Sequence, residues 1–352
     1  MDVLKIKLKL LTCLIQTYIS LLLLFTAHTS KAFADWYSEH IYYVLVNTIG
    51  CFFGLFPFSV VEMGLYLLIL FLIWKSIHFR VALWREYGSS LLLIVSTLLF
   101  LFTINCGINY GRSSFSETAD IQVSSYTVED LKEVCLFVTE QVNILSEQME
   151  RGESGVALMP ADEVPEKAQE ALINLGTIYP VMEGYYPVPK GLTFPYILSV
   201  QQLSGIYSPF TIEANYNSAM TEYNLAFTAC HELSHLRGFM QEQEANFLAY
   251  LACIHSDDIA FQYSGYLSGW VYATNQLYRT DYNAYKEVAE QLTSSAWVDL
   301  KANNAFWNQY DGKVAELADE VNNTYLKANG QSEGVKSYNR MMDLMVAYYF
   351  MN

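Results

Sequence analysis

The sequence predicts an α+β protein: about three N-terminal transmembrane helices, then a mostly helical domain with a small antiparallel sheet. Apolar residues make up 53% of the chain and are concentrated in its first third. Residues 180–217 combine prolines and glycines with β-forming residues, whereas the chain from Thr221 onward has no proline and a helical pattern. We therefore expect a membrane region over residues 1–106 and an exposed domain over residues 107–352.

Three apolar segments form the predicted membrane region. Leu8–Phe25 contains only Lys9 as a charged residue, and Ser89–Cys106 contains none. The segment between these two, Val60–Trp74, contains only Glu62 as a charged residue. A helix needs about 20 mostly apolar residues to cross a bilayer, so the lipid bilayer is an expected partner. The predicted spans lie near residues 8–27, 58–75 and 88–106.

The first span is either a retained anchor or a signal peptide that is removed. A basic start precedes it, and the small-x-small pattern Ala32-Phe33-Ala34 follows it. Basic residues also fill the loop between the second and third spans, which places both basic stretches on the cytoplasmic side. These residues are Lys5, Lys7, Lys9, Lys75, Arg80 and Arg85. Residues 107–352 are then expected on the extracytoplasmic side of the cytoplasmic membrane.

The exposed domain is strongly acidic. The whole chain has a formal net charge of −16, and its first 106 residues contain seven Lys or Arg and five Asp or Glu. Residues 107–352 therefore carry −18. A nucleic acid is excluded as a partner, because binding to phosphates requires a basic surface.

Local patterns predict the elements of this domain in order. Thr127-Val128-Glu129-Asp130 resembles a capping box that begins an amphipathic helix ending near Glu150. A short helix is expected over Pro165–Leu175. Tyr196–Val200 and Gly205–Tyr207 have the composition of strands. From Thr221 onward the pattern is helical, with isolated glycines.

The pentapeptide His231-Glu232-Leu233-Ser234-His235 predicts a metal site. Residues i and i+4 share a helix face, so both imidazoles can bind one ion while Glu232 projects beside them. The pentapeptide alone also fits a helix with two surface histidines, but its uncharged neighbours favour the metal site. The cofactor expected from this spacing is one Zn²⁺ per chain.

A catalytic zinc site needs a third protein ligand. Glu242 and Glu244 begin a second helix after Gly238, and at a spacing of two they point about 200° apart, so they cannot both face one ion. Glu242 is the predicted ligand because Asn246, four residues on, could orient a ligand histidine. Glu244 is the alternative. His255 would lie about 20 Å along the same helix from Glu242, too far to share the ion.

The motifs resemble two groups of known proteins. HExxH followed by Glu-x-x-Ala-Asn, formed here by Glu242, Ala245 and Asn246, is similar to the gluzincin metallopeptidases. Two differences are the short gap from His235 to Glu242 and Asn246 where aspartate is usual. The strings HELSHLRGFMQEQEANFLAYLAC and GIYSPFTIEANYN, with the apolar N-terminal third, resemble a bacterial membrane family described as domain of unknown function 3810. The resemblance implies a zincin-like peptidase domain and names no substrate.

The predicted function is zinc-dependent hydrolysis of peptide bonds in extracytoplasmic or envelope proteins. His231, His235 and Glu242 hold the zinc, and Glu232 is the general base that accepts a proton from the activated water. Ser204–Ala214 is the expected edge strand for the peptide or protein substrate, although an ordinary hairpin fits equally. The oxyanion donor is open among Tyr338, Arg340 and the pair Tyr263 and Tyr266.

Other functions are weighed against this one. A metal-binding membrane sensor or scaffold without activity is the alternative, and the intact Glu232 argues against it. An intramembrane protease is disfavoured because Glu222, Arg237, Glu242 and Glu244 make the neighbourhood of the motif too polar. A transporter is excluded by the small number of apolar segments.

Overall fold

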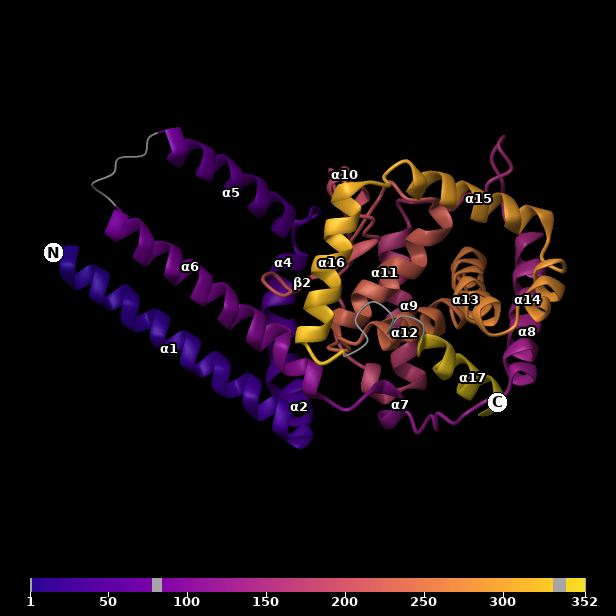
Figure 1. Ribbon diagram of the computed structural model, residues 1–352, viewed down its shortest axis with the longest axis horizontal. Coiled ribbons are helices and arrows are strands. Elements are labelled where there is room, and N and C mark those ends of the chain that lie inside the picture. The colour runs from indigo at the N-terminus through magenta and orange to yellow at the C-terminus, as the bar shows by residue number, and fades with distance from the viewer. Residues whose placement is uncertain (1, 78–83, 332–339, 352) are drawn as a thin grey trace. The chain divides into compact units, whose positions relative to one another are not determined.

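The computed structural model describes residues 2–77, 84–331 and 340–351. The chain divides into two compact units. The N-terminal unit comprises residues 1–113 together with residues 208–213, and the C-terminal unit comprises residues 114–207 and 214–352 (Figure 1). The short segment 208–213 thus belongs to the N-terminal unit although the residues on both sides of it belong to the other.

Long apolar helices dominate the N-terminal unit. α1 (Asp2–Thr29) and α6 (Trp84–Asn105) lie side by side and run in the same direction (Figure 1). Polar side chains join them: the Lys9 ammonium donates to Ser90 Oγ at 2.7 Å, and the Ser96 hydroxyl donates to Gln16 Oε1 at 2.9 Å. α5 (Val60–Ile77) comes between α1 and α6 in the sequence and runs in the opposite direction. The short elements of this unit are α2 (Lys31–Tyr37), η1 (Ser38–Tyr42), α3 (Tyr43–Leu45), η2 (Val46–Gly50), α4 (Cys51–Gly54) and η4 (Gly107–Gly111).

Two of the described helices, rather than three, are long and apolar enough to cross a membrane. They cover Leu4–Thr29 and Gly88–Asn105. The predicted span over 58–75 is shorter than expected, because the helix begins only at Val60 and its apolar part ends at Trp74. Fifteen helical residues extend about 22 Å, less than the roughly 30 Å of a hydrocarbon core. Of the about three transmembrane helices predicted, two are thus found among the described helices.

The C-terminal unit is mostly helical, as predicted. The Thr127 side chain accepts from the Asp130 N–H and the Asp130 side chain accepts from the Thr127 N–H, which confirms the capping box. α8 ends at Ser146, before the expected Glu150, where the Arg151 guanidinium donates to Ser146 Oγ at 2.7 Å. The helices are α7 (Phe115–Thr118), α8 (Val128–Ser146), α9 (Val164–Ile178), η5 (Pro180–Met182), α10 (Tyr196–Ser199), α11 (Glu222–Leu236), α12 (Glu242–Ile254), α13 (Ile259–Thr280), α14 (Tyr282–Ala289), α15 (Ser294–Asn308), α16 (Lys313–Ala328) and α17 (Met341–Met351).

The sheet is small, as predicted, but it is mixed rather than antiparallel. Its order is β1 (Lys190–Gly191), β3 (Glu213–Tyr216), β2 (Gly205–Ser208), and β1 pairs with β3 in parallel, with Lys190 opposite Asn215. The strand expected at Gly205–Tyr207 is confirmed as part of β2.

The strand expected at Tyr196–Val200 is instead the helical turn α10. Pro195 has helical backbone angles, and its carbonyl accepts the Ser199 N–H at 3.0 Å. This local hydrogen bond overrides the β-forming composition of the segment, which decides strand formation only weakly.

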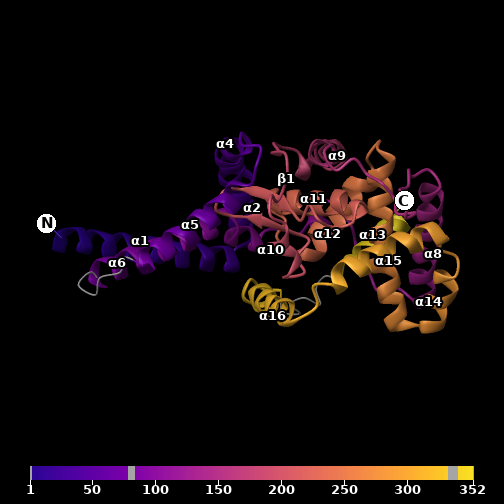
Figure 2. The same cartoon turned by 90° about the horizontal axis from the view of Figure 1, so that it is seen from above.

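Helices α11 and α12 lie in the core of the C-terminal unit, where α9 and α13 pack against them (Figure 2). Between them the chain reverses at Gly238, whose φ of 98° lies in the left-handed region. Such a backbone strongly favours glycine, so this residue ends the first helix as the sequence predicted. Almost every residue from Leu225 to Leu236 is buried, which holds the backbone of α11 rigidly.

Candidate metal centre

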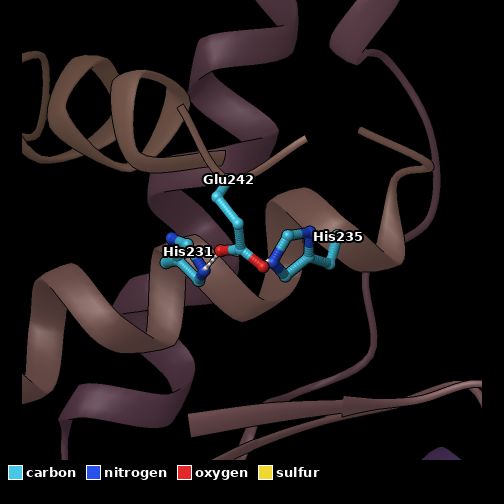
Figure 3. Close-up of side chains that lie close together, drawn as sticks. All are labelled: His231, His235 and Glu242. Carbon is cyan, nitrogen blue, oxygen red and sulfur yellow. Dashed lines mark ion pairs between the residues drawn. The ribbon is translucent and has the colours of Figure 1, made fainter. Parts of the chain in front are cut away.

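The residues of the HELSH pentapeptide lie in the last two turns of α11. His231 and His235 project from the same face of this helix, and α12 begins with Glu242 across the Gly238 turn. Figure 3 shows the Glu242 carboxylate between the two imidazoles. Two successive buried helices therefore supply all three side chains.

The distances between the ligand atoms suit a single ion. Glu242 Oε2 lies 3.3 Å from His231 Nε2 and 3.6 Å from His235 Nε2. One nitrogen or oxygen from each residue lies within 4.8 Å of the others. Two ligand atoms at about 2.1 Å from an ion with tetrahedral geometry lie about 3.4 Å apart. Two imidazoles and one carboxylate at these distances could hold a zinc ion.

Hydrogen bonding orients the second histidine. Nδ1 of His235 donates to the carbonyl of Phe239 at 2.9 Å, which turns Nε2 toward Glu242. Burial lowers the pKa of His235, but the carboxylates of Glu242 and Glu232 and the Phe239 carbonyl together raise it to about 9. Burial favours the neutral form of Glu242, yet the two imidazoles hold its pKa well below its usual range. In the absence of metal, a proton on His235 takes the place of the cation.

Glu232 lies beside the three ligands and is only 3% exposed. Within the described part of the chain, its Oε2 has no hydrogen-bond partner, whereas the backbone N–H of Tyr207 in β2 donates to its carboxylate. Burial raises the pKa of Glu232 to about 7, although the histidines and the Tyr207 N–H oppose this. A carboxylate with a pKa near neutrality, and with one oxygen unpaired, is suited to accept and return a proton.

Glu244, the alternative ligand, points away from the histidines. Its Oε1 accepts the backbone N–H of Phe115 at 2.8 Å, and the side chain is buried. The two glutamates therefore diverge, as two residues at this spacing on a helix must. Glu242 joins the histidines, and Glu244 ties α12 to the start of α7.

Asn246 makes no hydrogen bond to either histidine within the described residues. Its amide lies beside the hydroxyl of Tyr272 in α13, and its Nδ2 has no hydrogen-bond partner there. The orienting hydrogen bond expected from Asn246 is supplied to His235 by the Phe239 carbonyl instead. Burial raises the pKa of Tyr272, and the charge of Glu242 raises it further. Sequence reasoning missed Tyr272, and no signal distinguishes it among 27 tyrosines.

The remaining predicted residues lie elsewhere. His255 is the C-cap of α12, where its Nε2 lies 2.9 Å from the hydroxyl of Tyr348. The Tyr263 hydroxyl donates to Asp299, and the Tyr266 ring packs against Phe137. Arg340 lies on the surface, and Tyr338 lies outside the described residues.

A comparison with family models identifies the chain. The model of a protein family of unknown function, DUF3810, matches residues 37–346. The chain belongs to this family. No curated protein and no solved structure matches it. The match spans parts of both units and includes the whole candidate metal centre.

Glycine at position 205 is required by its contact with Glu232. A Cβ atom built on Gly205 would lie 2.4 Å from Glu232 Oε1 and 2.7 Å from its Cγ. We expect Gly205→Ala to displace the Glu232 carboxylate and to lower kcat about 100-fold while the metal stays bound. Steady-state peptide hydrolysis and metal analysis measure the two effects. Gly64→Ala, where the added atom meets nothing within 4 Å, is the control. Unchanged kcat in Gly205→Ala would contradict the contact.

Metal binding should release a proton. Because the pKa of His235 is about 9 in the metal-free chain, this imidazole is protonated at pH 7.5 and must lose its proton before Nε2 can bind a cation. We expect about one proton released per zinc bound at pH 7.5. Zinc affinity should therefore increase with pH and level off above pH 9. Titration calorimetry in buffers of different ionisation enthalpy measures the release. Binding without proton release would contradict the ion pair.

Proposed function

We propose that this protein is a membrane-anchored, zinc-dependent metallopeptidase that hydrolyses peptide bonds of extracytoplasmic or envelope proteins. The observation that carries the proposal is the convergence of His231, His235 and Glu242 beside a buried Glu232. Residues of this kind at this spacing are typical of zincin peptidases. The gluzincin resemblance of the motifs supports the same assignment.

The residues divide the chemistry between them. His231, His235 and Glu242 would hold zinc, which supplies a Lewis acid and lowers the pKa of water. Glu232 accepts the proton of the attacking water and passes it to the leaving amine. Its burial against β2 keeps its pKa near neutrality, so that both transfers are accessible at neutral pH. We assign the Tyr272 hydroxyl as a polar donor near the site. It lies beside the Asn246 amide, and the Glu242 carboxylate is near enough to raise the pKa of Tyr272.

The edge of the sheet is the proposed docking position for the substrate backbone. In the order β1-β3-β2, β2 is an outer strand of the described sheet, and its Tyr207 N–H already reaches Glu232. An extended peptide can add to such an edge through backbone hydrogen bonds. Ile206, which is 45% exposed, would contact its side chains.

The apolar helices of the N-terminal unit support attachment to a membrane. α1 and α6 are long enough to cross it, and basic residues precede α1. We place the C-terminal unit outside the cytoplasmic membrane on the basis of this charge distribution. Its acidic character is compatible with an aqueous, extracytoplasmic location.

Metal analysis and peptide cleavage by the full-length protein test the proposal. The chain purified in detergent should contain about one zinc per molecule and should cleave an unstructured protein such as casein. A chelator should abolish cleavage, and added zinc should restore it. Zinc without cleavage would favour a metal-binding sensor or scaffold. Absence of stoichiometric zinc would overturn both metal functions.

A further inference from the structure

Two buried cysteines lie next to each other inside the C-terminal unit. Cys230 is in α11, directly before the ligand residue His231, and Cys253 is in the last turn of α12. Both side chains are fully buried, and the Cys253 thiol donates to the sulfur of Cys230 at 3.9 Å. The two helices that carry the metal ligands therefore contact each other through a pair of thiols.

The third helix of the core, α13, packs against this pair. A Cβ atom built on Gly265 of α13 would lie 2.6 Å from the Cβ atom of Cys253, so the α13 backbone lies directly on this cysteine. The neighbouring Ser264 accepts the backbone N–H of Phe227, three residues before Cys230 in α11, at 3.1 Å. Because α13 is packed on both helices beside the thiols, the spacing of the two cysteines is fixed by the core.

The spacing of the two sulfurs is close to that of a disulfide. A disulfide requires an S–S distance of about 2.05 Å, so the sulfurs of Cys230 and Cys253 have to approach by roughly 1.9 Å. Rotation about the Cα–Cβ bond of each cysteine moves its sulfur while the helix stays in place. The bond can therefore form within the observed packing of α11 and α12.

We propose that Cys230 and Cys253 form a disulfide that joins α11 to α12 at the metal centre. Each thiol gives up its hydrogen and one S–S bond forms between them, while a disulfide oxidant of the cell envelope is reduced to two thiols. Because both sulfurs are buried in the folded unit, the exchange takes place while the unit folds. The oxidising surroundings rest on the extracytoplasmic location in the proposed function, whereas the contact between the sulfurs does not.

The bond encloses the whole metal centre in one covalent loop. The chain between Cys230 and Cys253 contains all three clustered ligand residues and the proposed base. Closing such a loop restricts the unfolded chain, so it stabilises the folded state whether or not a metal is bound. The disulfide thus keeps the two ligand-bearing helices together when zinc is scarce outside the cell.

Peptide mapping of the full-length protein tests for the bond directly. The protein is purified in detergent, denatured with an alkylating reagent present, and digested with trypsin without reductant. Cleavage after Arg237 separates Cys230 from Cys253, and each of the two tryptic peptides, 191–237 and 238–279, contains no other cysteine. The expected product is one species that joins both peptides and separates on reduction. Alkylated thiols at both positions would overturn the proposal.

Thermal unfolding of the metal-free protein measures what the bond contributes. Cys230→Ala is expected to lower Tm by about 5–10 °C, and a reductant should lower the Tm of the wild type by a similar amount. The reductant should leave Cys230→Ala unchanged. The double variant with Cys253→Ala should be about as stable as either single variant, because one bond is lost only once.

Cys135→Ala is the matched control. This cysteine is also fully buried in the C-terminal unit, and among the described residues its sulfur has no contact with another cysteine. The Tm of Cys135→Ala should still fall when reductant is added. Losses that add in the double variant and do not depend on reductant would show that the two cysteines only fill the core, and would overturn the stabilising role.

The outcomes also separate the disulfide from the proposed peptidase. Joined peptides from a chain that binds no zinc and cleaves no protein would establish the bond and reject the proposed function. Cleavage by a chain in which both cysteines are free thiols would reject the bond and support the proposed function.

Discussion

Glu232→Gln is expected to lower kcat by about 10²–10⁴-fold and to leave the zinc content unchanged. The substitution keeps the size of the side chain and removes its ability to accept a proton. Glu232 is not among the three clustered ligand residues, so its replacement should not weaken metal binding. Peptide hydrolysis and metal analysis of the same preparation measure both quantities.

The environment of Glu232 explains the size of this effect. The carboxylate is buried, and its Oε2 lacks a hydrogen-bond partner within the described ranges. Its pKa of about 7 places the acid and base forms close in free energy at neutral pH. An amide can still accept the Tyr207 N–H, so the local structure should persist in the variant. Activity close to that of the wild type would reject Glu232 as the base.

Glu242→Ala is expected to remove zinc and activity together. The carboxylate lies between the two imidazoles, and the described residues offer no other carboxylate in that cluster. Loss of a direct ligand should weaken zinc binding by more than the roughly 10–100-fold that loss of an outer hydrogen-bond partner costs. Competition with a chromogenic chelator measures the affinity.

Glu244→Gln is the matched control for Glu242→Ala. Both residues are glutamates in the first turn of α12, but Glu244 accepts the N–H of Phe115 instead of facing the histidines. We expect Glu244→Gln to keep zinc and activity and to lower the free energy of unfolding by about 1–3 kcal/mol, because a buried charged hydrogen bond is weakened. Zinc loss in Glu244→Gln with retention in Glu242→Ala would reverse the ligand assignment.

Much of the local structure could be predicted from short-range patterns. The capping box at Thr127 and Asp130 and the glycine that ends α11 are encoded within a few residues, because caps and left-handed turns depend on local backbone chemistry. The relative directions of His231, His235, Glu242 and Glu244 follow in the same way from the helix repeat. These predictions required no knowledge of distant contacts.

Other features depend on distant residues and were missed. The parallel pairing of Lys190 with Asn215 joins segments separated by a helical turn and a strand, so composition could not predict a mixed sheet. The helical turn at Tyr196–Ser199 was missed for a different reason, because its hydrogen bonds are local and β-forming composition decides strand formation only weakly. The place of Tyr272 beside Asn246 depends on how α13 packs on α12, which no local pattern specifies.

The sequence by itself determined which residues can form the metal centre, because a helix places residues four apart on one face whatever surrounds it. Only the tertiary structure decided the surroundings of the Glu232 carboxylate. Its burial, its unpaired oxygen and its contacts with Gly205 and Tyr207 arise where β2 packs against α11. Desolvation and close packing depend on atoms from distant parts of the chain, so they exist only in the folded protein.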